Sequence, residues 1–395
     1  MLPASTTAAP GVVTVHRRGV ERLQRGAPWV FRGDVLQAPA ADGDVVEMRD
    51  GRGKPVGVAL WAERGPLALR RWGPPGSRAD NETLCARLDA AMALRERALP
   101  GVTAVRLVHG EADALPGLFV DRYGDALCVQ TACAAMERRL PAVVARLRAA
   151  CAPALVVRRD DGSARDLEQL PRVKEILHGG PGTAARYRVG ALTLEADLLH
   201  GPKTGAYLDQ RDNHLLAGRV ARGRCLDAFS ALGGFGLQMA ARAQAVICLE
   251  QEPQSVDAIR RNAAVNGLLD RVDARAANAF DALRALHDAR ERFDTVVVDP
   301  PALAKRAGPP EGALRGYFEL NRRAIQLCRP GAFLLSFSCS GRVTVDLLED
   351  VVLQAARATR RFPRLLARLA AGPDHPGRSG LPEAEYLKGV LLQVP

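Results

Sequence analysis

Two apolar segments in the C-terminal half each end on a side chain that could take part in chemistry. FLLSFSCSGR, residues 333–342, places Cys339 between two serines and before a glycine, and VVVDPPAL, residues 296–303, reaches Asp299 before two prolines. If both segments are strands of one parallel sheet, the thiol and the carboxylate emerge side by side at its carboxyl edge, where such sheets bind ligands. That pairing suits chemistry on a nucleic-acid base. For Cys339 taken alone, a buried strand cysteine without a chemical role is the simpler interpretation.

The segment LDAFSALGGFG, residues 226–236, is typical of a ligand-binding turn between a strand and a helix. Asp227 ends the strand, Phe229 follows in the turn, and glycines that include Gly233 let the backbone approach a nucleoside-bearing ligand closely. A dinucleotide site would require GxGxxG, but Met239 stands where the third glycine would be. The sequence of this turn therefore disfavours an NAD-binding site.

Polar residues also end the next two expected strands. Glu250 ends AVICLE, where a carboxylate can accept hydrogen bonds from two ribose hydroxyls. Capping of the following helix is its alternative role. Asn278 ends VDARAAN and could bond an adenine edge or simply start a helix. We therefore expect each of these two residues either to contact a cofactor or to cap a helix.

From Gly223 onward, segments typical of strands alternate with segments typical of helices. The expected strands are RCLDAF, AVICLE, VDARAAN, DTVVVDP and AFLLSFSC, and two further extended runs, RLLARLAA and YLKGVLLQV, follow them. This alternation predicts an α/β fold with a doubly wound parallel sheet. Such a sheet would bring the strand ends described above to one edge.

Two smaller regions precede this sheet. Residues 11–72 contain short alternating runs rich in valine and glycine, which predict a small β-barrel-like module, and residues 72–81 have the composition of a linker. A middle α+β segment follows, with helices expected over 82–99 and 136–150. We therefore expect three domains, with the bounds 1–76, 77–196 and 197–395.

The first module carries arginines around two aromatic residues, Trp29 and Phe31. These arginines are Arg17, Arg18, Arg22, Arg25 and Arg32. Basic side chains interleaved with aromatics suit an RNA surface, and a solvated basic edge is the alternative. The net charge of +11 and the isoelectric point near 9.7 favour a polyanionic partner, but a merely basic enzyme fits the charge equally well.

The sequence composition limits where in the cell the protein is expected and whether it is expected to hold a metal. The eight cysteines form no CxxC pair, so a zinc or iron–sulfur site is not expected. No uncharged apolar run is long enough to cross a bilayer, and the N-terminal residues lack the pattern of a secretory signal. We therefore expect a cytosolic protein without metal or membrane partners. The oligomeric state stays open, a homodimer included.

Together with DPP at Asp299, the strand-end acids Asp227 and Glu250 resemble those of the class I S-adenosylmethionine-dependent methyltransferases. The resemblance sharpens at four motifs: LPGLFVDRYG at 115–124, HGPKTGAYLDQRDN at 200–213, FSCSG at 337–341 and DHPGRSGLPEAEYLKG at 374–389. With these, the chain is similar over nearly its whole length to the RlmI-type 23S ribosomal RNA cytosine-5 methyltransferases. That resemblance implies a PUA RNA-binding domain, a small α+β domain and a Rossmann-like methyltransferase domain.

The resemblance also implies roles for individual residues. Cys339 would add to C6 of cytosine, which makes C5 able to attack the methyl group of S-adenosylmethionine, and Asp299 would hold the N3 and N4 edge of the base. Lys203, Tyr207, Gln210 and Arg211 would flank the cofactor or the target nucleotide. The implied cofactor contacts are Asp227, Phe229, Gly233, Glu250, Asn278, Asp299 and Gln210. The implied contacts to ribosomal RNA are Pro300, Lys203, Arg211, Arg17 and Arg18.

Two positions depart from related patterns. Another group of RNA cytosine-5 methyltransferases carries a second cysteine directly after the proline pair, where this chain has Ala302, as in the RlmI-type pattern. Because Ala302 cannot act as a releasing thiol, water or another group must complete the release of Cys339 from the product. The second departure is Asn278, where many relatives have aspartate.

Two other functions fit parts of the same sequence. A guanine N-methyltransferase would use the DPP segment for an amine or a ring nitrogen and would need no thiol, so a Cys339→Ala variant distinguishes it. A non-catalytic RNA-binding or ribosome-assembly factor would bind no S-adenosylmethionine. The acids at 227, 250 and 299 favour an enzyme.

Overall fold

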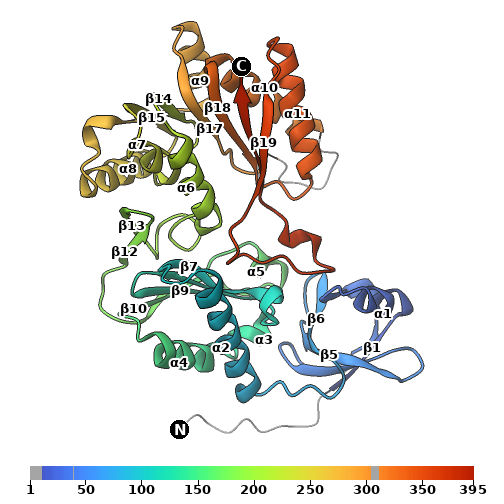
Figure 1. The fold of residues 1–395 in the computed structure, drawn as a ribbon. Coiled ribbons are helices and arrows are strands. Elements are labelled where there is room, and N and C mark those ends of the chain that lie inside the picture. The colour runs from blue at the N-terminus through green and yellow to red at the C-terminus, as the bar shows by residue number, and fades with distance from the viewer. Residues whose placement is uncertain (1–10, 39, 304–310) are drawn as a thin grey trace. The chain divides into compact units, whose positions relative to one another are not determined.

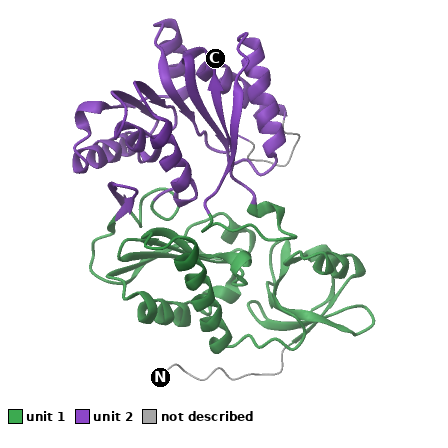
Figure 2. Ribbon diagram, viewed as in Figure 1, with its two compact units in different colours: residues 1–186, 197–205, 373–384 green, residues 187–196, 206–372, 385–395 purple. Residues whose placement is uncertain are grey.

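The computed structural model describes residues 11–38, 40–303 and 311–395. The chain forms two compact units (Figure 2). Unit 1 contains residues 1–186, 197–205 and 373–384, and unit 2 contains residues 187–196, 206–372 and 385–395. The expected domain bounds remain a prediction. The N-terminal residues 1–10, on which the expected absence of a secretory signal partly rests, lie outside the described ranges.

Unit 1 begins with a six-stranded sheet in the order β2-β6-β5-β4-β1-β3 (Figure 1), in agreement with the expected β-rich first module. In β4, Val46 and Met48 are fully buried and alternate with more exposed neighbours, because successive strand residues face opposite sides. The bounds are β1 (Gly11–Val15), β2 (Trp29–Phe31), β3 (Val35–Gln37), β4 (Val45–Arg49), β5 (Pro55–Trp61) and β6 (Leu67–Gly73), with a short 3₁₀ turn η1 (Arg32–Asp34).

The sequence pattern predicts neither the helix α1 (Arg17–Gln24) of this module nor the end of its last strand. The helix is eight residues long and mostly polar, and only Gly19 and Leu23 are buried, so few apolar residues mark it in the sequence. The expected linker 72–81 is wrong at its start, because Trp72 belongs to β6 and is buried. Its indole Nε1 donates to the carbonyl of Arg78 at 2.9 Å.

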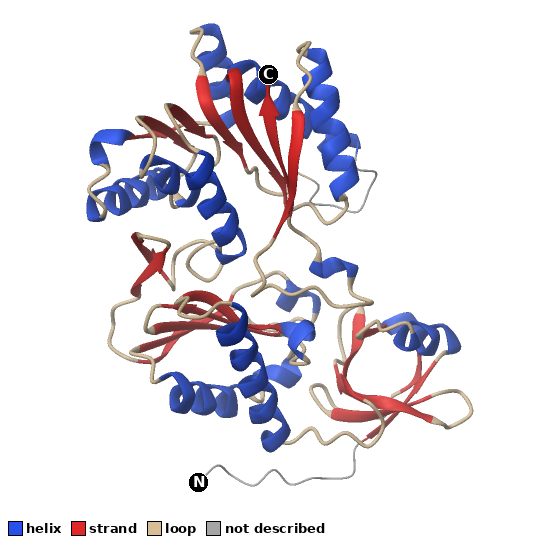
Figure 3. Cartoon of the chain, in the orientation of Figure 1, coloured by secondary structure: helices blue, strands red, loops and turns tan. Residues whose placement is uncertain are grey.

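A five-stranded sheet in the order β11-β10-β9-β8-β7 follows, with helices on it (Figure 3). The helix expected over 136–150 is two helices, since Pro141 occupies the first turn of α4, where proline favours a helix start. The strands are β7 (Ala104–His109), β8 (Leu118–Tyr123), β9 (Ala126–Thr131), β10 (Leu155–Asp160) and β11 (Val173–His178). The helices are α2 (Asn81–Ala98), α3 (Ala134–Glu137), α4 (Leu140–Cys151) and α5 (Ala164–Leu167), with the 3₁₀ turn η2 (Gly110–Asp113). A two-stranded sheet, β12 (Ala184–Val189) and β13 (Leu192–Asp197), comes next.

Unit 2 is built on a seven-stranded sheet in the order β16-β15-β14-β17-β18-β20-β19. The first five of these strands are parallel, and β20 runs antiparallel to β18 and β19. The strands are β14 (Arg224–Asp227), β15 (Ala245–Glu250), β16 (Val272–Ala276), β17 (Phe293–Val298), β18 (Cys328–Ser338), β19 (Arg364–Ala370) and β20 (Lys388–Val394). The doubly wound α/β fold is thus confirmed.

Helices connect the parallel strands of unit 2. An apolar cluster joins the sheet to α9, α10 and α11 and includes the fully buried Val296, Leu334 and Val352. The helices are α6 (Arg211–Val220), α7 (Gly234–Ala240), α8 (Pro253–Val265), α9 (Ala279–Asp288), α10 (Glu311–Leu327) and α11 (Val345–Ala358), and the 3₁₀ turns are η3 (Leu208–Gln210), η4 (Leu269–Arg271) and η5 (Pro382–Ala384). Because the chain order runs outward in both directions from β14, the strand order reverses between β14 and β17, which is where such sheets bind ligands.

Residues 373–384 join β19 to β20 but belong to unit 1. There the buried Asp374 accepts a hydrogen bond from the amide of Arg106 at 2.9 Å, and its carbonyl accepts one from the Arg95 guanidinium at 3.0 Å. The ring of His375 lies against that of His109, with 5.2 Å between centroids. A late segment of the chain therefore completes the packing of the first unit.

Within the described ranges, none of the helices combines the length and the apolar character needed to span a membrane. No three or more His, Cys, Asp or Glu side chains of those same residues gather in a way that could hold a metal ion.

Candidate active site at the carboxyl edge of the parallel sheet

The ends of β17 and β18 bring Asp299 and Cys339 together. Val298 pairs with Ser336 in parallel register, so both side chains leave adjacent strands at the same edge of the sheet. The Cys339 Sγ lies 3.9 Å from the carbonyl oxygen of Pro300, in the residue that follows Asp299. Cys339 is only partly buried, unlike the core cysteines Cys225, Cys248 and Cys328. A partly buried cysteine therefore lies at the same strand edge as Asp299.

The two serines beside Cys339 anchor its loop to α10. The Ser338 hydroxyl donates to the Tyr317 hydroxyl at 2.8 Å, and the Tyr317 and Ser340 hydroxyls share a hydrogen bond of 3.0 Å. The Ser340 amide also donates to Ser338 Oγ at 3.2 Å. Burial raises the pKa of Tyr317, which keeps this phenol neutral and able to donate. The polar setting of Cys339 thus fixes the backbone that carries the thiol.

Lys388, at the start of β20, is a site residue to which the sequence reasoning gave no role. Its buried ammonium donates to the carbonyl of Ser340 at 2.7 Å and to that of Tyr386 at 2.8 Å. Burial lowers the pKa of Lys388, and the nearby Cys339 opposes that shift. The motif that contains Lys388 was visible in the sequence, but only the antiparallel pairing of β20 with β18 places this lysine behind the cysteine loop.

A chain of side-chain amides holds Asp299. Gln210 Nε2 donates to Asp299 Oδ2 at 2.9 Å, and Asn213 Nδ2 donates to Gln210 Oε1 at 2.7 Å. Asn213 in turn is tied to the carbonyl of Ala370 at 3.0 Å. Gln210 and Asn213 are both buried, so this chain fixes the direction in which the carboxylate points.

Tyr207 lies within electrostatic reach of several of these groups. Burial raises the pKa of its phenol to about 12, and Asp299, Asp209, Glu250 and Cys339 add to the shift. The phenol is therefore a neutral hydrogen-bond donor near both the carboxylate and the thiol.

Asp227 ends β14 with an incompletely satisfied carboxylate. Its Oδ2 accepts from the Gly236 amide at 2.9 Å, whereas its buried Oδ1 has no hydrogen-bond partner among the described residues. Burial raises the pKa of Asp227 to about 7. Gly236 must lack a side chain, since a Cβ there would lie 2.3 Å from Cys248 Sγ. The turn is thus tightly packed around a carboxylate that lacks one hydrogen-bond donor.

Glu250 and Asn278 occupy the neighbouring strand ends. Glu250 Oε2 accepts from the Ala231 amide of the glycine turn at 2.7 Å, and Oε1 accepts from the Gln251 amide at 2.7 Å. The Glu252 amide also donates to Oε1, at 3.3 Å, so Oε2 is the oxygen that keeps a second lone pair for a hydroxyl group. Asn278 caps α9 by accepting from the Phe280 amide at 3.0 Å, so its side-chain oxygen has the capping role that the sequence left open.

The remaining candidates differ in their surroundings. Phe229 is partly buried against the core of unit 2, Gly233 takes the left-handed conformation before α7 with φ of 87°, and Pro300 is buried. Arg211 is buried and pairs with Asp212 at 3.0 Å. Lys203 is exposed and belongs to unit 1, as do Arg17 and Arg18 on α1.

The residues at this edge fit a nucleoside-bearing methyl donor. The unpartnered Asp227 Oδ1 needs a hydrogen-bond donor, the turn around Gly233 and Gly236 presents backbone rather than side chains, and Glu250 Oε2 keeps a lone pair. An ammonium group and ribose hydroxyls supply such donors.

Comparison with known proteins gives two matches to family models. Residues 13–72 match the PUA-like domain family, and residues 212–307 match the family described as conserved hypothetical protein 95. Among solved structures, the methyltransferase SMU.776 in complex with SAH superposes with a TM-score of 0.82 at 17% identity, over 97% of this chain and 100% of that one. This likeness shows the fold alone.

Curated relatives match along almost the whole chain. The ribosomal RNA large subunit methyltransferase I of Shewanella amazonensis is 35% identical over 94% of this chain and 96% of its own length. The protein of the same name from Cronobacter sakazakii is 33% identical over 96% of this chain and 98% of its own length.

Proposed function

The chain belongs to the ribosomal RNA large subunit methyltransferase I family, and we propose that it methylates C5 of a cytosine in 23S ribosomal RNA with S-adenosylmethionine as donor. Membership in this family makes it a methyltransferase of large-subunit ribosomal RNA. The observation that carries the cytosine-5 chemistry is the pair of adjacent strand ends, which brings Cys339 and Asp299 to one edge of the sheet, with the thiol 3.9 Å from the Pro300 carbonyl oxygen.

Each group of the site has a separate task in this reaction. S-adenosylmethionine supplies the methyl group as an electrophile. The Cys339 thiolate would form a bond from Sγ to C6 of the base, so that C5 gains enamine character and can take the methyl group as the methyl–sulfur bond breaks and S-adenosylhomocysteine leaves. Asp299, fixed by Gln210, holds the N3 and N4 edge and stabilises the charge that develops there. When a base has removed the C5 proton, the bond from Sγ to C6 breaks and restores the thiolate.

The donor site is proposed at the ends of β14 and β15. Asp227 and Glu250 supply carboxylate oxygens, while Gly233 and Phe229 shape the turn. Asn278 is proposed as an adenine contact only through its Nδ2 group, because its oxygen caps α9.

Arg17 and Arg18 are proposed as phosphate contacts of the PUA-like domain. Their side chains are 89% and 65% exposed, and each is held by one acid, Glu21 or Asp34. Lys203 and Arg211 are proposed as further RNA contacts, Arg211 after a rearrangement that exposes it. A cytosolic location, proposed from the sequence, agrees with a ribosomal RNA substrate.

The test replaces Cys339 by Ala and measures methyl transfer to 23S ribosomal RNA together with calorimetric binding of S-adenosylmethionine. We expect transfer to fall to background while donor binding stays within about twofold, because Cys339 is not among the donor contacts. Cys328→Ala, a change at a buried core cysteine, is the matched control and keeps transfer if the fold is intact.

Two outcomes would contradict the proposal. Near-normal transfer by the Cys339→Ala variant, with methylguanine as the product found by nucleoside mass mapping, would identify a guanine N-methyltransferase. Absence of donor binding by the unchanged protein would point to a non-catalytic RNA-binding factor.

A further inference from the structure

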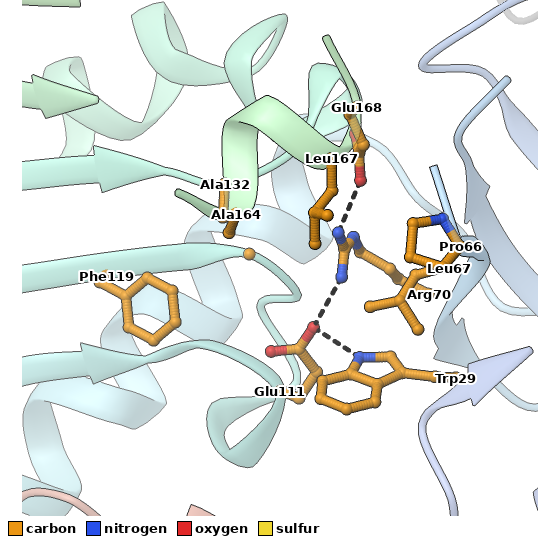
Figure 4. Close-up of a pocket in the computed structure, with 11 residues that line it drawn as sticks. Trp29, Pro66, Leu67, Arg70, Glu111, Phe119, Ala132, Ala164, Leu167 and Glu168 are labelled. Atoms are coloured by element: carbon orange, nitrogen blue, oxygen red, sulfur yellow. Dashed lines mark hydrogen bonds and ion pairs between the residues drawn. The ribbon is translucent and has the colours of Figure 1, made fainter. Parts of the chain in front are cut away.

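Unit 1 contains a cavity of about 190 Å³ that the proposed reaction does not use (Figure 4). Aromatic and aliphatic side chains line it, with Trp29 and Leu67 from the six-stranded sheet, Phe119 from the five-stranded sheet and Leu167 from α5. The cavity is smaller than the roughly 300–1,000 Å³ of sites for drug-sized ligands, so it has room for a single ring system. Half-exposed aromatic faces are surfaces on which a flat heterocycle can stack.

Three charged side chains meet at the cavity. The buried Arg70 guanidinium donates to Glu168 Oε1 at 2.6 Å and lies 3.6 Å from Glu111 Oε1. Trp29 Nε1 also donates to Glu111 Oε1, at 2.9 Å. Two carboxylates thus share one guanidinium, which leaves an excess negative charge in a largely apolar place. Such a charge is stabilised by further hydrogen-bond donors.

Two atoms of this cluster still lack partners. Glu111 Oε2 has no hydrogen bond within the described residues, and in Figure 4 the carboxylate turns this oxygen towards the side of Phe119. The buried Arg70 Nε likewise has no partner there. Both oxygens of Glu168, in contrast, are engaged, Oε1 by Arg70 and Oε2 by the Ala134 amide at 3.3 Å. Glu111 is therefore the carboxylate that is free to bind a ligand.

Two arginines near Glu111, Arg71 and Arg378, lie outside the lining of the cavity. Arg378 donates to the backbone carbonyl of Glu111, and Arg71 is close enough to lower the pKa of Arg378, although burial is the larger cause of that shift. Both arginines are partly exposed, and neither forms an ion pair with any described residue. A ligand with a flat ring and a phosphate would satisfy the carboxylate and the arginines together.

We propose that this cavity binds one unstacked guanine of the RNA substrate, with Glu111 accepting hydrogen bonds from the base and Arg71 and Arg378 facing its phosphates. Guanine places two N–H donors, at N1 and N2, side by side, whereas uracil flanks its only N–H donor with two carbonyl oxygens that repel a carboxylate. The inference rests on the proposed RNA substrate, and it adds a second base-binding site that selects where the enzyme docks.

The test compares the labelled pentaribonucleotides UUGUU and UUUUU by fluorescence anisotropy with the full chain and no methyl donor. We expect UUGUU to bind about tenfold tighter, the effect of one hydrogen bond to a charged group. Glu111→Gln should abolish this preference. Glu168→Gln is the matched control, because it removes the same charge beside Arg70 but no unpartnered oxygen, and it should keep the preference.

Several results would overturn the inference: equal binding of the two oligonucleotides by the unchanged protein, binding of neither, or equal loss of the preference in both glutamine variants. If Glu111→Gln does not fold, Ala164→Leu takes its place, since Ala164 is exposed at the cavity and leucine would fill it. Retained preference in that variant would refute the site. The assay needs neither Cys339 nor the methyl donor, so its failure leaves the proposed reaction untouched, and failure of the reaction leaves this result standing.

Discussion

Replacing Asp227 with Asn should stabilise the ligand-free protein at neutral pH. Burial raises the pKa of this carboxyl from 3.8 to about 7, so between these values the folded chain holds a proton that the unfolded chain has lost. The free energy of unfolding must then fall as pH rises through this window, by up to about 1.4 kcal/mol per pH unit and about 4 kcal/mol in total. The side chain at position 227 of the Asp227→Asn variant is neutral at every pH, so the variant's free energy of unfolding does not fall for this reason.

Urea unfolding of both proteins at pH 4.5, 6.0 and 7.5 measures the effect. We expect the variant's advantage to grow by several kcal/mol from the lowest pH to the highest, while its calorimetric affinity for S-adenosylmethionine falls steeply. Asp257→Asn is the control, because that carboxylate is 61% exposed in its ion pair with Arg260 and should show no such trend. A constant difference between variant and unchanged protein at all three pH values would refute the reasoning about Asp227.

Three further changes probe the rest of the site. Lys388→Met leaves the Ser340 and Tyr386 carbonyls without their donor, so it should lower the free energy of unfolding by about 2–4 kcal/mol and remove methyl transfer. Lys388→Arg should restore part of both the stability and the activity. Full activity of the Met variant would contradict this role. Gly236→Ala sets a Cβ against Cys248 Sγ and should lower the free energy of unfolding, measured in urea, by about 1–3 kcal/mol. If this clash is the cause, the additional change Cys248→Ala should reduce the loss. Asn278→Ala removes the cap of α9 and should cost about 1 kcal/mol, with donor affinity by calorimetry nearly unchanged; a tenfold weaker affinity would instead establish the adenine contact.

The strand ends of unit 2 could be predicted because they depend on local pattern. Buried parallel strands are short apolar runs, and a polar residue that ends such a run must lie at the carboxyl edge. Asp227, Glu250 and Asp299 follow from this rule alone. The rule could not decide the role of Asn278, since a residue that follows a strand is also one that precedes a helix.

The supporting contacts could not be predicted because they join distant parts of the chain. Gln210 reaches Asp299 across 89 positions, and Lys388 reaches Ser340 across 48. The helix α1 was missed for another reason: it has only eight residues, most of them polar, and it buries only Gly19 and Leu23, too few positions to identify a helix from the sequence. The aromatic and basic pattern around Trp29 was visible in the sequence, but its hydrogen bond to Glu111 depends on tertiary packing.

Because residues 373–384 belong to unit 1, that unit cannot finish folding until the ribosome has made most of unit 2. Residues 1–205 are made first, yet Arg95 and the amide of Arg106 bind Asp374 only after residues 206–372 have been made. A nascent chain therefore carries an unfinished first unit throughout the synthesis of the second. Any truncation before residue 373 leaves that gap permanently, so neither unit can be excised as one continuous stretch of the gene.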